Sequence, residues 1–356
     1  MQKIAVIGTT TWGTTLAILL AGKGTEVRLW ARTLKEARLI RKKGSEPARL
    51  PDVALPEQII VTGKMAEALE DANAVILAVP SATMRQNISQ AANHLAKSTI
   101  VISAAKGLEL GSNKRMSQVI AEEIDERFIS NICVLSGPNL AREIIDNHPA
   151  AAVVASENRE TARKAQKLLT CPNFCVFTNS DVIGVELGGS LKNIIALGAG
   201  IADGLGYGDN AKAAFVTRGL TEITALGMAM GANPLTFSGL AGLGDVIATC
   251  SSPLSRNHYV GSELAKGRPL GEIMESMSEV AEGVNTTLVA TSLAEKLGLE
   301  MPITEKIYQV LYEDADPHQA AVELMGGNAR HELTGKRWRL FSLFRRRKKT
   351  SANQEE

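Results

Sequence analysis

The chain has 356 residues, of which 45% are hydrophobic and 22% are charged, as is typical of a globular protein with room for two domains. Lys and Arg total 39 and Asp and Glu total 38, so no overall charge attracts the protein to nucleic acid or to an anionic membrane. The four cysteines are too few for a disulfide framework and are typical of reduced thiols in the cytoplasm. We therefore expect a cytoplasmic protein in which charge acts only locally.

Neither the N-terminus nor any apolar run is predicted to insert into a membrane. Residues 1–7 contain one lysine and an apolar run much shorter than the core of a signal peptide, and they lead into a glycine turn, so a strand is expected there. The longest apolar stretch, around residues 194–201, is flanked by Lys192 and Asp203 and falls short of the roughly 20 residues that span a bilayer. No transmembrane segment is predicted.

The first half of the sequence alternates short β-branched runs with helical stretches, a pattern that predicts a mostly parallel sheet covered by helices. The expected strands are residues 4–7, 27–30, 59–61, 74–79, 99–103, 132–135 and 152–155. From Asp181 the segments 181–204 and 211–231 are rich in Ala, Gly, Leu and Glu, which indicates helices. We predict an α/β domain over residues 1–180, an all-α domain over 181–334 and a basic, flexible tail over 335–356.

The first strand, turn and helix carry a degenerate dinucleotide-binding fingerprint. Gly8 and Gly13 are present, but Thr10 replaces the middle glycine that lets a backbone approach pyrophosphate closely, and its Cβ is expected to push a cofactor outward. The second strand ends near Arg32, where an NAD-selective site usually offers Asp or Glu to the ribose. Arg32 either pairs with a 2′-phosphate, which slightly favours NADP over NAD, or is a solvated surface charge.

One short cysteine pair, Cys171 and Cys175, has the spacing of half a metal site. Zinc needs a second Cys or His pair at ligand spacing, which the sequence lacks. We predict no metal, and two buried thiols beside a turn at Pro172.

Seven ordered motifs occupy the rest of the chain: AKGLE at 105–109, SGPNLARE at 136–143, LKN at 191–193, GLAGLGD at 239–245, TCSS at 249–252, LSRN at 254–257 and VAEG at 280–283. With these motifs, residues 1–333 resemble the bacterial type of NAD(P)-dependent glycerol-3-phosphate dehydrogenase. The resemblance implies a Rossmann-like N-terminal domain, a helical substrate domain and a homodimer. It also implies an oxidoreductase that reversibly reduces dihydroxyacetone phosphate to sn-glycerol 3-phosphate, a phospholipid precursor.

The same resemblance assigns site residues by position. Lys192 matches the catalytic lysine, and Lys106 and Asp245 are the other catalytic candidates. The implied substrate positions are Lys106, Gly137, Asn139, Lys192, Asn193, Asp245, Thr249, Ser255, Arg256 and Asn257. The implied cofactor positions, together with the glycine turn, are Gly8, Thr10, Thr11, Trp12, Gly13, Arg32, Lys106, Ala141, Arg256, Val280 and Glu282.

The chemistry of a ketone reduction explains why two lysines and an aspartate are useful together. Hydride delivery to the carbonyl carbon builds negative charge on oxygen, so a partly buried lysine can supply both a positive charge and a proton. Lys106 follows an expected strand, where it adds a second cation, although a loop lysine is usually exposed. Asp245 is expected to keep Lys192 charged against desolvation, unless it merely caps a helix after Gly244.

Two helical features have both a functional and a structural interpretation. If a helix starts at Ser255, Arg256 and Asn257, its free N–H groups add to a phosphate site, although the tripeptide alone is an ordinary helix cap. The face of segment 181–204 that bears Lys192 also carries small residues, Gly188 and Gly200 among them. Small residues alone are typical of close helix packing, but beside the motifs above we expect this face to leave room for a ligand next to Lys192.

Two residues depart from the bacterial pattern, and two alternative functions are considered. Asn139 stands where Ser or Thr is usual and resembles the eukaryotic branch, and Arg49 replaces a common Tyr. The alternatives are a Rossmann dehydrogenase of the 6-phosphogluconate or hydroxyacid type and a non-catalytic relative that binds a metabolite.

The tail, with Trp338 and Phe341 among basic residues, contacts an anionic membrane surface or simply aids solubility.

Overall fold

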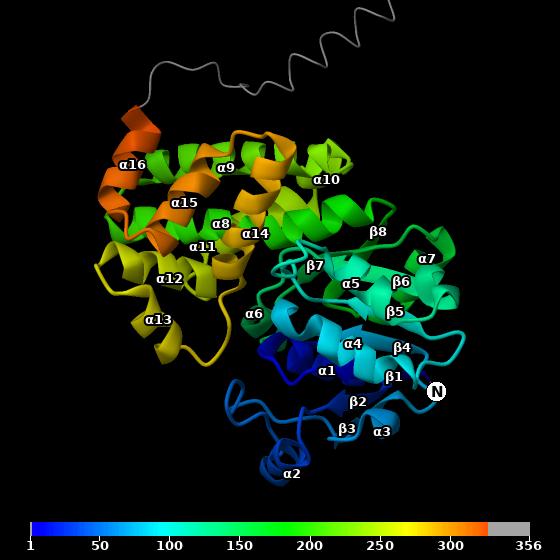
Figure 1. Cartoon of the computed structure of the whole chain (residues 1–356). Helices are drawn as coiled ribbons and strands as arrows, with labels where there is room; N and C mark the ends of the chain where they lie inside the picture. Colours follow the sequence, from blue (N-terminus) through cyan, green and yellow to red (C-terminus); the bar gives the residue numbers. More distant parts are fainter. Residues whose placement is uncertain (1, 327–356) are drawn as a thin grey trace, which may run out of the picture.

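The computed structural model describes residues 2–326, so the tail predicted at 335–356 lies outside it. The N-terminal domain is built on one eight-stranded sheet in the order β3-β2-β1-β4-β5-β6-β7-β8 (Figure 1). The strands are β1 Lys3–Ile7, β2 Glu26–Trp30, β3 Ile59–Thr62, β4 Ala74–Leu77, β5 Ile100–Ser103, β6 Ile132–Ser136, β7 Ala150–Ala155 and β8 Phe174–Asn179. β6 and β7 pair antiparallel and the other neighbours pair parallel, which confirms the mostly parallel α/β prediction.

Helices cover both faces of this sheet, as a parallel sheet requires. One face packs against α1 (Thr11–Gly22), α2 (Leu34–Lys43), α6 (Ala141–Ile145) and α7 (Arg159–Leu169). The opposite face packs against α3 (Met65–Leu69), α4 (Met84–Ala92) and α5 (Met116–Glu123). Alternate residues of β1 point to the two cores, so Ile4 and Val6 serve the first and Ala5 and Ile7 the second.

Strand β8 was not predicted, and its position explains why the expected burial of Cys175 is wrong. It lies at the edge of the sheet, where Phe174 and Val176 are buried while Cys175 and Phe177 are exposed. A strand buried on one side only is a weak sequence signal beside the fully apolar central strands. Cys171 is buried as expected, but Cys175 is exposed, which corrects the prediction of two buried thiols.

The second domain is helical, as predicted, and surrounds α8 (Figure 1). Its helices are α8 Val182–Gly204, α9 Asp209–Ala229, α10 Pro234–Phe237, α11 Asp245–Ser251, α12 Arg256–Ala265, α13 Leu270–Ser276, α14 Glu282–Leu297, α15 Pro302–Tyr312 and α16 Pro317–Gly326, with a π-helical turn at Leu240–Gly244. Within residues 2–326, α8 is the one helix long and apolar enough to cross a membrane, but 94% of its most apolar stretch is buried inside the protein. α8 is therefore the core helix of this domain.

The small residues of α8 serve close packing. A Cβ built on Gly188 would lie 2.5 Å from the Ala241 carbonyl oxygen, and one on Gly200 would lie 2.0 Å from that of His258. The neighbouring backbones thus approach α8 where only a hydrogen atom fits. The expectation that this face leaves room for a ligand is therefore corrected at Gly188 and Gly200, where it packs against neighbouring backbone.

Candidate functional site

A cleft of about 500 Å³ lies between the two domains. The sheet contributes the β1–α1 turn and the chain that follows the C-terminal ends of β4 and β5. The strand order reverses between β1 and β4, and such a switch point is where open α/β sheets bind ligands. The helical domain contributes α8, α11, the start of α12 and the segment 277–282. We call this space the interdomain cleft.

Two lysines from different domains share one carboxylate at the base of the cleft. Lys106 follows β5, and its Nζ donates to Asp245 Oδ2 at 2.7 Å and to the Gly137 carbonyl oxygen at 2.8 Å. Lys192 projects from α8, and its Nζ donates to Asp245 Oδ1 and to Thr249 Oγ1. Asp245 is 1% exposed. Asp245 therefore does more than begin α11, because it orients both amines.

The environment of Lys192 tunes its proton affinity. Burial lowers the pKa of Lys192 from 10.5 to about 8, while the Asp245 carboxylate opposes that fall and the Lys106 ammonium adds to it. An amine with this pKa can exchange a proton near neutral pH. The cleft therefore contains a group suited to acid and base chemistry on a ligand oxygen.

The start of α12 provides donors at the other side of the cleft. Ser255 is the N-cap residue of α12, and its Oγ accepts from His258 N at 3.3 Å. The helix begins at Arg256, whose side chain is 47% exposed, and the first-turn N–H groups of a helix are available to an anion. Asn257 Oδ1 accepts from Gly283 N at 2.9 Å, which fixes its amide. The predicted helix start is confirmed, and it faces the cleft.

Asn139 brings an unsatisfied acceptor to the cleft. Its Nδ2 donates to the carbonyl oxygens of Pro138 and Ala151 at 3.0 and 3.1 Å, whereas its buried Oδ1 has no hydrogen-bond partner among the described residues. Buried polar atoms are rarely left unpaired, so this oxygen indicates a place for a ligand donor such as a hydroxyl group. Asn193 lies nearby, and its Nδ2 donates to the Lys106 carbonyl oxygen at 3.3 Å.

The glycine turn fits a dinucleotide despite Thr10. Gly8 has φ +112°, and a Cβ on it would lie 2.7 Å from the Ala78 carbonyl oxygen. A Cβ on Gly13 would lie 2.1 Å from the Gly8 oxygen, so α1 packs directly on β1. Thr10 is the N-cap residue of α1: its Oγ1 accepts from Gly13 N at 3.0 Å and donates to the Ala78 carbonyl oxygen at 2.7 Å. The hydroxyl group thus ties the turn together.

Three charged residues that the sequence did not assign to the site lie near the β1–α1 turn, and Arg49 and Glu279 among them line the cleft. Glu279 Oε1 accepts from the Thr11 N–H at 3.0 Å and lies 3.3 Å from Arg49 Nε. The other oxygen, Oε2, lies 3.3 Å from Arg256 Nη1. Glu36 accepts from Thr9 Oγ1 at 2.5 Å. Arg49 had a signal, because it departs from the usual Tyr, but Glu279 and Glu36 had none.

Glu282 joins the domains beside the cleft. Its carboxylate accepts from Ser81 N at 2.8 Å and from Ser81 Oγ at 2.5 Å, and burial raises its pKa above the usual value. Gly107 packs against this pair, since a Cβ there would lie 2.7 Å from the Glu282 carboxylate. Glu282 therefore connects α14 to the chain that follows β4.

Most of the predicted site residues line the interdomain cleft. Its lining includes Thr10, Thr11, Trp12, Lys106, Asn139, Ala141, Lys192, Asn193, Thr249, Ser255, Arg256, Asn257, Val280 and Glu282. Gly8, Gly13, Gly137 and Asp245 support this lining through the contacts described above. Arg32 is exposed and is not part of the lining.

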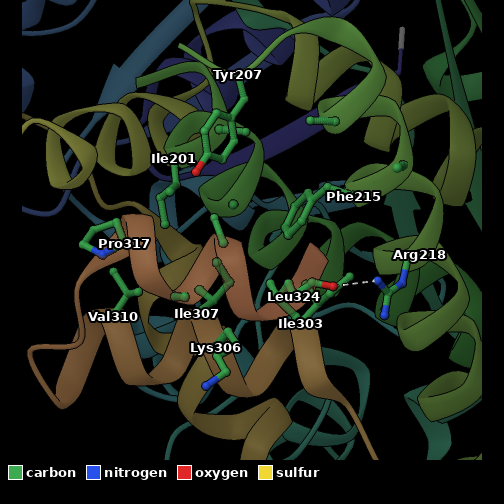
Figure 2. A pocket seen from close by; sticks show the side chains of 16 residues that line it. Ile201, Tyr207, Phe215, Arg218, Ile303, Lys306, Ile307, Val310, Pro317 and Leu324 are labelled. Carbon is green, nitrogen blue, oxygen red and sulfur yellow. Dashed lines mark hydrogen bonds between the residues drawn. The ribbon is translucent and has the colours of Figure 1, made fainter. Parts of the chain in front are cut away.

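A second cavity of about 200 Å³ lies in the helical domain, between α8, α9, α15 and α16. Figure 2 shows its mostly apolar walls, with Phe215, Ile303 and Ile307 at the centre, and the hydrogen bond from Arg218 to the Leu324 carbonyl oxygen, which measures 3.1 Å. None of the predicted site residues lines it. The chemistry-bearing groups therefore lie in the interdomain cleft.

Comparisons with known proteins agree with this geometry. Residues 3–162 match the family model for the N-terminus of NAD-dependent glycerol-3-phosphate dehydrogenase, and residues 181–322 match that for its C-terminus. A glycerol-3-phosphate dehydrogenase (NAD(P)+) of Dehalococcoides mccartyi is 62% identical over 98% of this chain and 97% of its own length. One from Geobacillus kaustophilus is 47% identical over 94% and 97% of the two chains. A crystal structure of the Coxiella burnetii glycerol-3-phosphate dehydrogenase superposes with a TM-score of 0.86 at 36% identity, covering 92% of this chain and 99% of that one.

Proposed function

The chain belongs to the NAD-dependent glycerol-3-phosphate dehydrogenase family, and we propose that its interdomain cleft interconverts dihydroxyacetone phosphate and sn-glycerol 3-phosphate with a nicotinamide cofactor. One observation carries the assignment of the chemistry to this cleft: the buried cluster of Lys192, Asp245 and Lys106 lies beside both a dinucleotide turn and an anion-binding helix start. The cluster supplies the proton and the positive charge that a carbonyl reduction needs.

Each member of the cluster has a distinct role in this proposal. When bound, the nicotinamide supplies or accepts the hydride at C2. Lys192 Nζ donates a proton to the carbonyl oxygen during reduction and takes one from the hydroxyl group during oxidation. Lys106 stabilises the developing negative charge, since its ammonium group is held in place by Asp245 and Gly137. Asp245 opposes the loss of charge on Lys192 and orients both amines toward the cleft.

The remaining polar groups position the substrate. A phosphate dianion leaving water needs several charge-assisted hydrogen bonds, and the start of α12 offers Arg256, the Ser255 hydroxyl group and backbone N–H groups. Asn139 Oδ1 accepts from a substrate hydroxyl group, which pairs the orphan oxygen. We propose Asn193 and Thr249 as further contacts, because both line the cleft beside Lys192.

For the cofactor, we propose that the β1–α1 turn, including Thr11 and Trp12, holds the pyrophosphate and that NADP is slightly favoured over NAD. The observation in favour of NADP is Arg32, an exposed guanidinium near the end of β2, because it can pair with a 2′-phosphate. Glu36, in the first turn of α2, offers a carboxylate to an unphosphorylated ribose, and we propose on this ground that NAD is accepted as well.

We also propose a domain boundary, an oligomeric state, a cellular location and a role for the tail. We propose a domain boundary at residues 180 and 181, because β8 ends at Asn179 and α8 begins at Val182. The family resemblance supports a cytoplasmic homodimer without metal that supplies glycerol 3-phosphate for phospholipid synthesis. Contact of the basic tail with an anionic membrane remains a sequence-based proposal, tested by co-sedimentation with liposomes of the full chain and of a chain that ends at Gly335.

The assay that tests the proposed function uses purified protein, dihydroxyacetone phosphate and either NADH or NADPH. We expect the absorbance of the reduced cofactor to fall, and to fall much more slowly when unphosphorylated dihydroxyacetone replaces the substrate. Binding of the metabolite and cofactor without turnover would instead indicate a non-catalytic relative. Faster turnover of 6-phosphogluconate or a simple hydroxyacid with oxidised cofactor would favour the other dehydrogenase classes.

A further inference from the structure

Glu279 spans the interdomain cleft beside the β1–α1 turn. It lies in the segment between α13 and α14, and its side chain is 15% exposed. One oxygen accepts from the Thr11 N–H at 3.0 Å and pairs with Arg49, while the other pairs with Arg256. A carboxylate of the helical domain is thus bound to the first residue of α1, a twelve-residue helix of the sheet domain.

The groups that hold Glu279 are those that a dinucleotide would use. In a dinucleotide-binding domain, the N–H groups at the start of the first helix bind the pyrophosphate. The Thr11 N–H is such a donor, and Arg49 adds a positive charge beside the same turn, where its Nη1 donates to the Thr9 carbonyl oxygen at 3.2 Å. A pyrophosphate and the Glu279 carboxylate cannot both accept from the Thr11 N–H along the same direction.

We propose that Glu279 is an internal competitor of the cofactor: it occupies the pyrophosphate site when no cofactor is bound, and cofactor binding displaces it from Thr11, Arg49 and Arg256. This inference rests on the proposed function, since it takes the interdomain cleft as the cofactor site. Displacement also removes a partner of Arg256, which then faces the substrate phosphate with its charge free. The carboxylate thereby lowers cofactor affinity.

The negative charge of Glu279 determines whether the residue weakens or strengthens cofactor binding. A Glu279 carboxylate that stayed near the turn would repel the pyrophosphate, and one that leaves must give up a charge-assisted hydrogen bond and two ion pairs. Both effects weaken cofactor binding. Glu279→Gln keeps the size of the side chain but removes its negative charge, so we expect cofactor dissociation constants to fall about tenfold, the size expected for one charge-assisted hydrogen bond.

The test is equilibrium titration of the full chain with NADH and with NADPH, followed by cofactor fluorescence in the absence of substrate. The variants are Glu279→Gln and Glu279→Ala, and the control is Glu275→Gln, an exposed carboxylate of α13 with no hydrogen bond or ion pair among residues 2–326. We expect tighter binding for both Glu279 variants and less than a twofold change for the control. Thermal unfolding of each variant confirms that it is folded.

A second titration locates the effect on the pyrophosphate. ADP carries the diphosphate group and adenosine does not, so Glu279→Gln should bind ADP more tightly while its adenosine affinity stays that of the wild type. Unchanged or weaker binding of cofactor by Glu279→Gln would overturn the competitor role and assign Glu279 to holding the bound state. A wild-type protein that binds neither cofactor would instead contradict the proposed function, so the two failures are distinguishable.

Discussion

Asp245→Asn is the substitution whose consequences follow most directly from the site. Asparagine keeps the size of the side chain and removes the negative charge that Lys106 and Lys192 share at 1% exposure. Two unit charges about 4 Å apart interact by about 4 kcal/mol at an effective dielectric of about 20. That energy corresponds to about three pKa units.

Asp245→Asn should lower the pKa of Lys192, because the Asp245 carboxylate favours the charged form of the amine. Burial already holds the pKa of Lys192 at about 8, and Asp245 opposes any further fall. With the carboxylate gone and Lys106 still charged, the pKa of Lys192 falls further. Relaxation and water entry reduce the effect below the Coulomb figure, so we expect a fall of about one unit or more. At neutral pH about half of the amine or more is then neutral and lacks the proton that reduction requires.

The assay is the pH dependence of kcat for reduction of dihydroxyacetone phosphate. We expect the alkaline limb to move to lower pH by about one unit or more in Asp245→Asn, because only the ammonium form of Lys192 donates a proton. Asp209→Asn, at the exposed start of α9, is the matched control and should leave the limb in place. An alkaline limb at the wild-type pH in Asp245→Asn would refute the proposed coupling between the carboxylate and Lys192.

Three further predictions concern the wild-type profile and two arginines. In the wild type, kcat for ketone reduction should fall as pH rises through about 8, the pKa of Lys192, and kcat for alcohol oxidation should rise through the same region; two profiles with the same slope there would contradict the acid and base roles. Arg256→Ala should raise KM for dihydroxyacetone phosphate about tenfold or more, through loss of a charge-assisted bond, with a smaller effect on kcat; an unchanged KM would remove Arg256 from the phosphate site. Arg32→Glu should shift kcat/KM toward NAD over NADP, and an unchanged ratio would show that Arg32 is a surface charge.

The sequence predicts the sheet domain well where strands are buried on both faces. β4 and β5 are entirely buried, so each appears as a continuous apolar run and was found. β8 was missed because exposed residues interrupt its apolar pattern at the sheet edge. Helix α8 was found by its composition, but the reason for its glycines became clear only with Ala241 and His258 packed against them.

Site residues in local motifs were likewise found from the sequence, whereas those defined by contacts distant in the chain were not. Lys106, Lys192 and Asp245 were found because each lies in a motif, although their shared contact joins residues 139 and 53 positions apart. Glu279 contacts Thr11 across 268 positions, and no local pattern marks a carboxylate that binds a distant helix start. Thr10 appeared to be a defect of the glycine turn, yet its hydroxyl group caps α1.

The fate of the transferred hydride tests the central claim most directly. Dihydroxyacetone phosphate is incubated with the protein and with NADH or NADPH that carries deuterium as the transferable hydrogen at C4, and the product is examined by nuclear magnetic resonance. We predict sn-glycerol 3-phosphate with one deuterium at C2, and a fall in rate of about a hundredfold or more in Lys192→Met, as expected for loss of a general acid. Product without deuterium at C2, or Lys192→Met with the wild-type rate, would contradict the account.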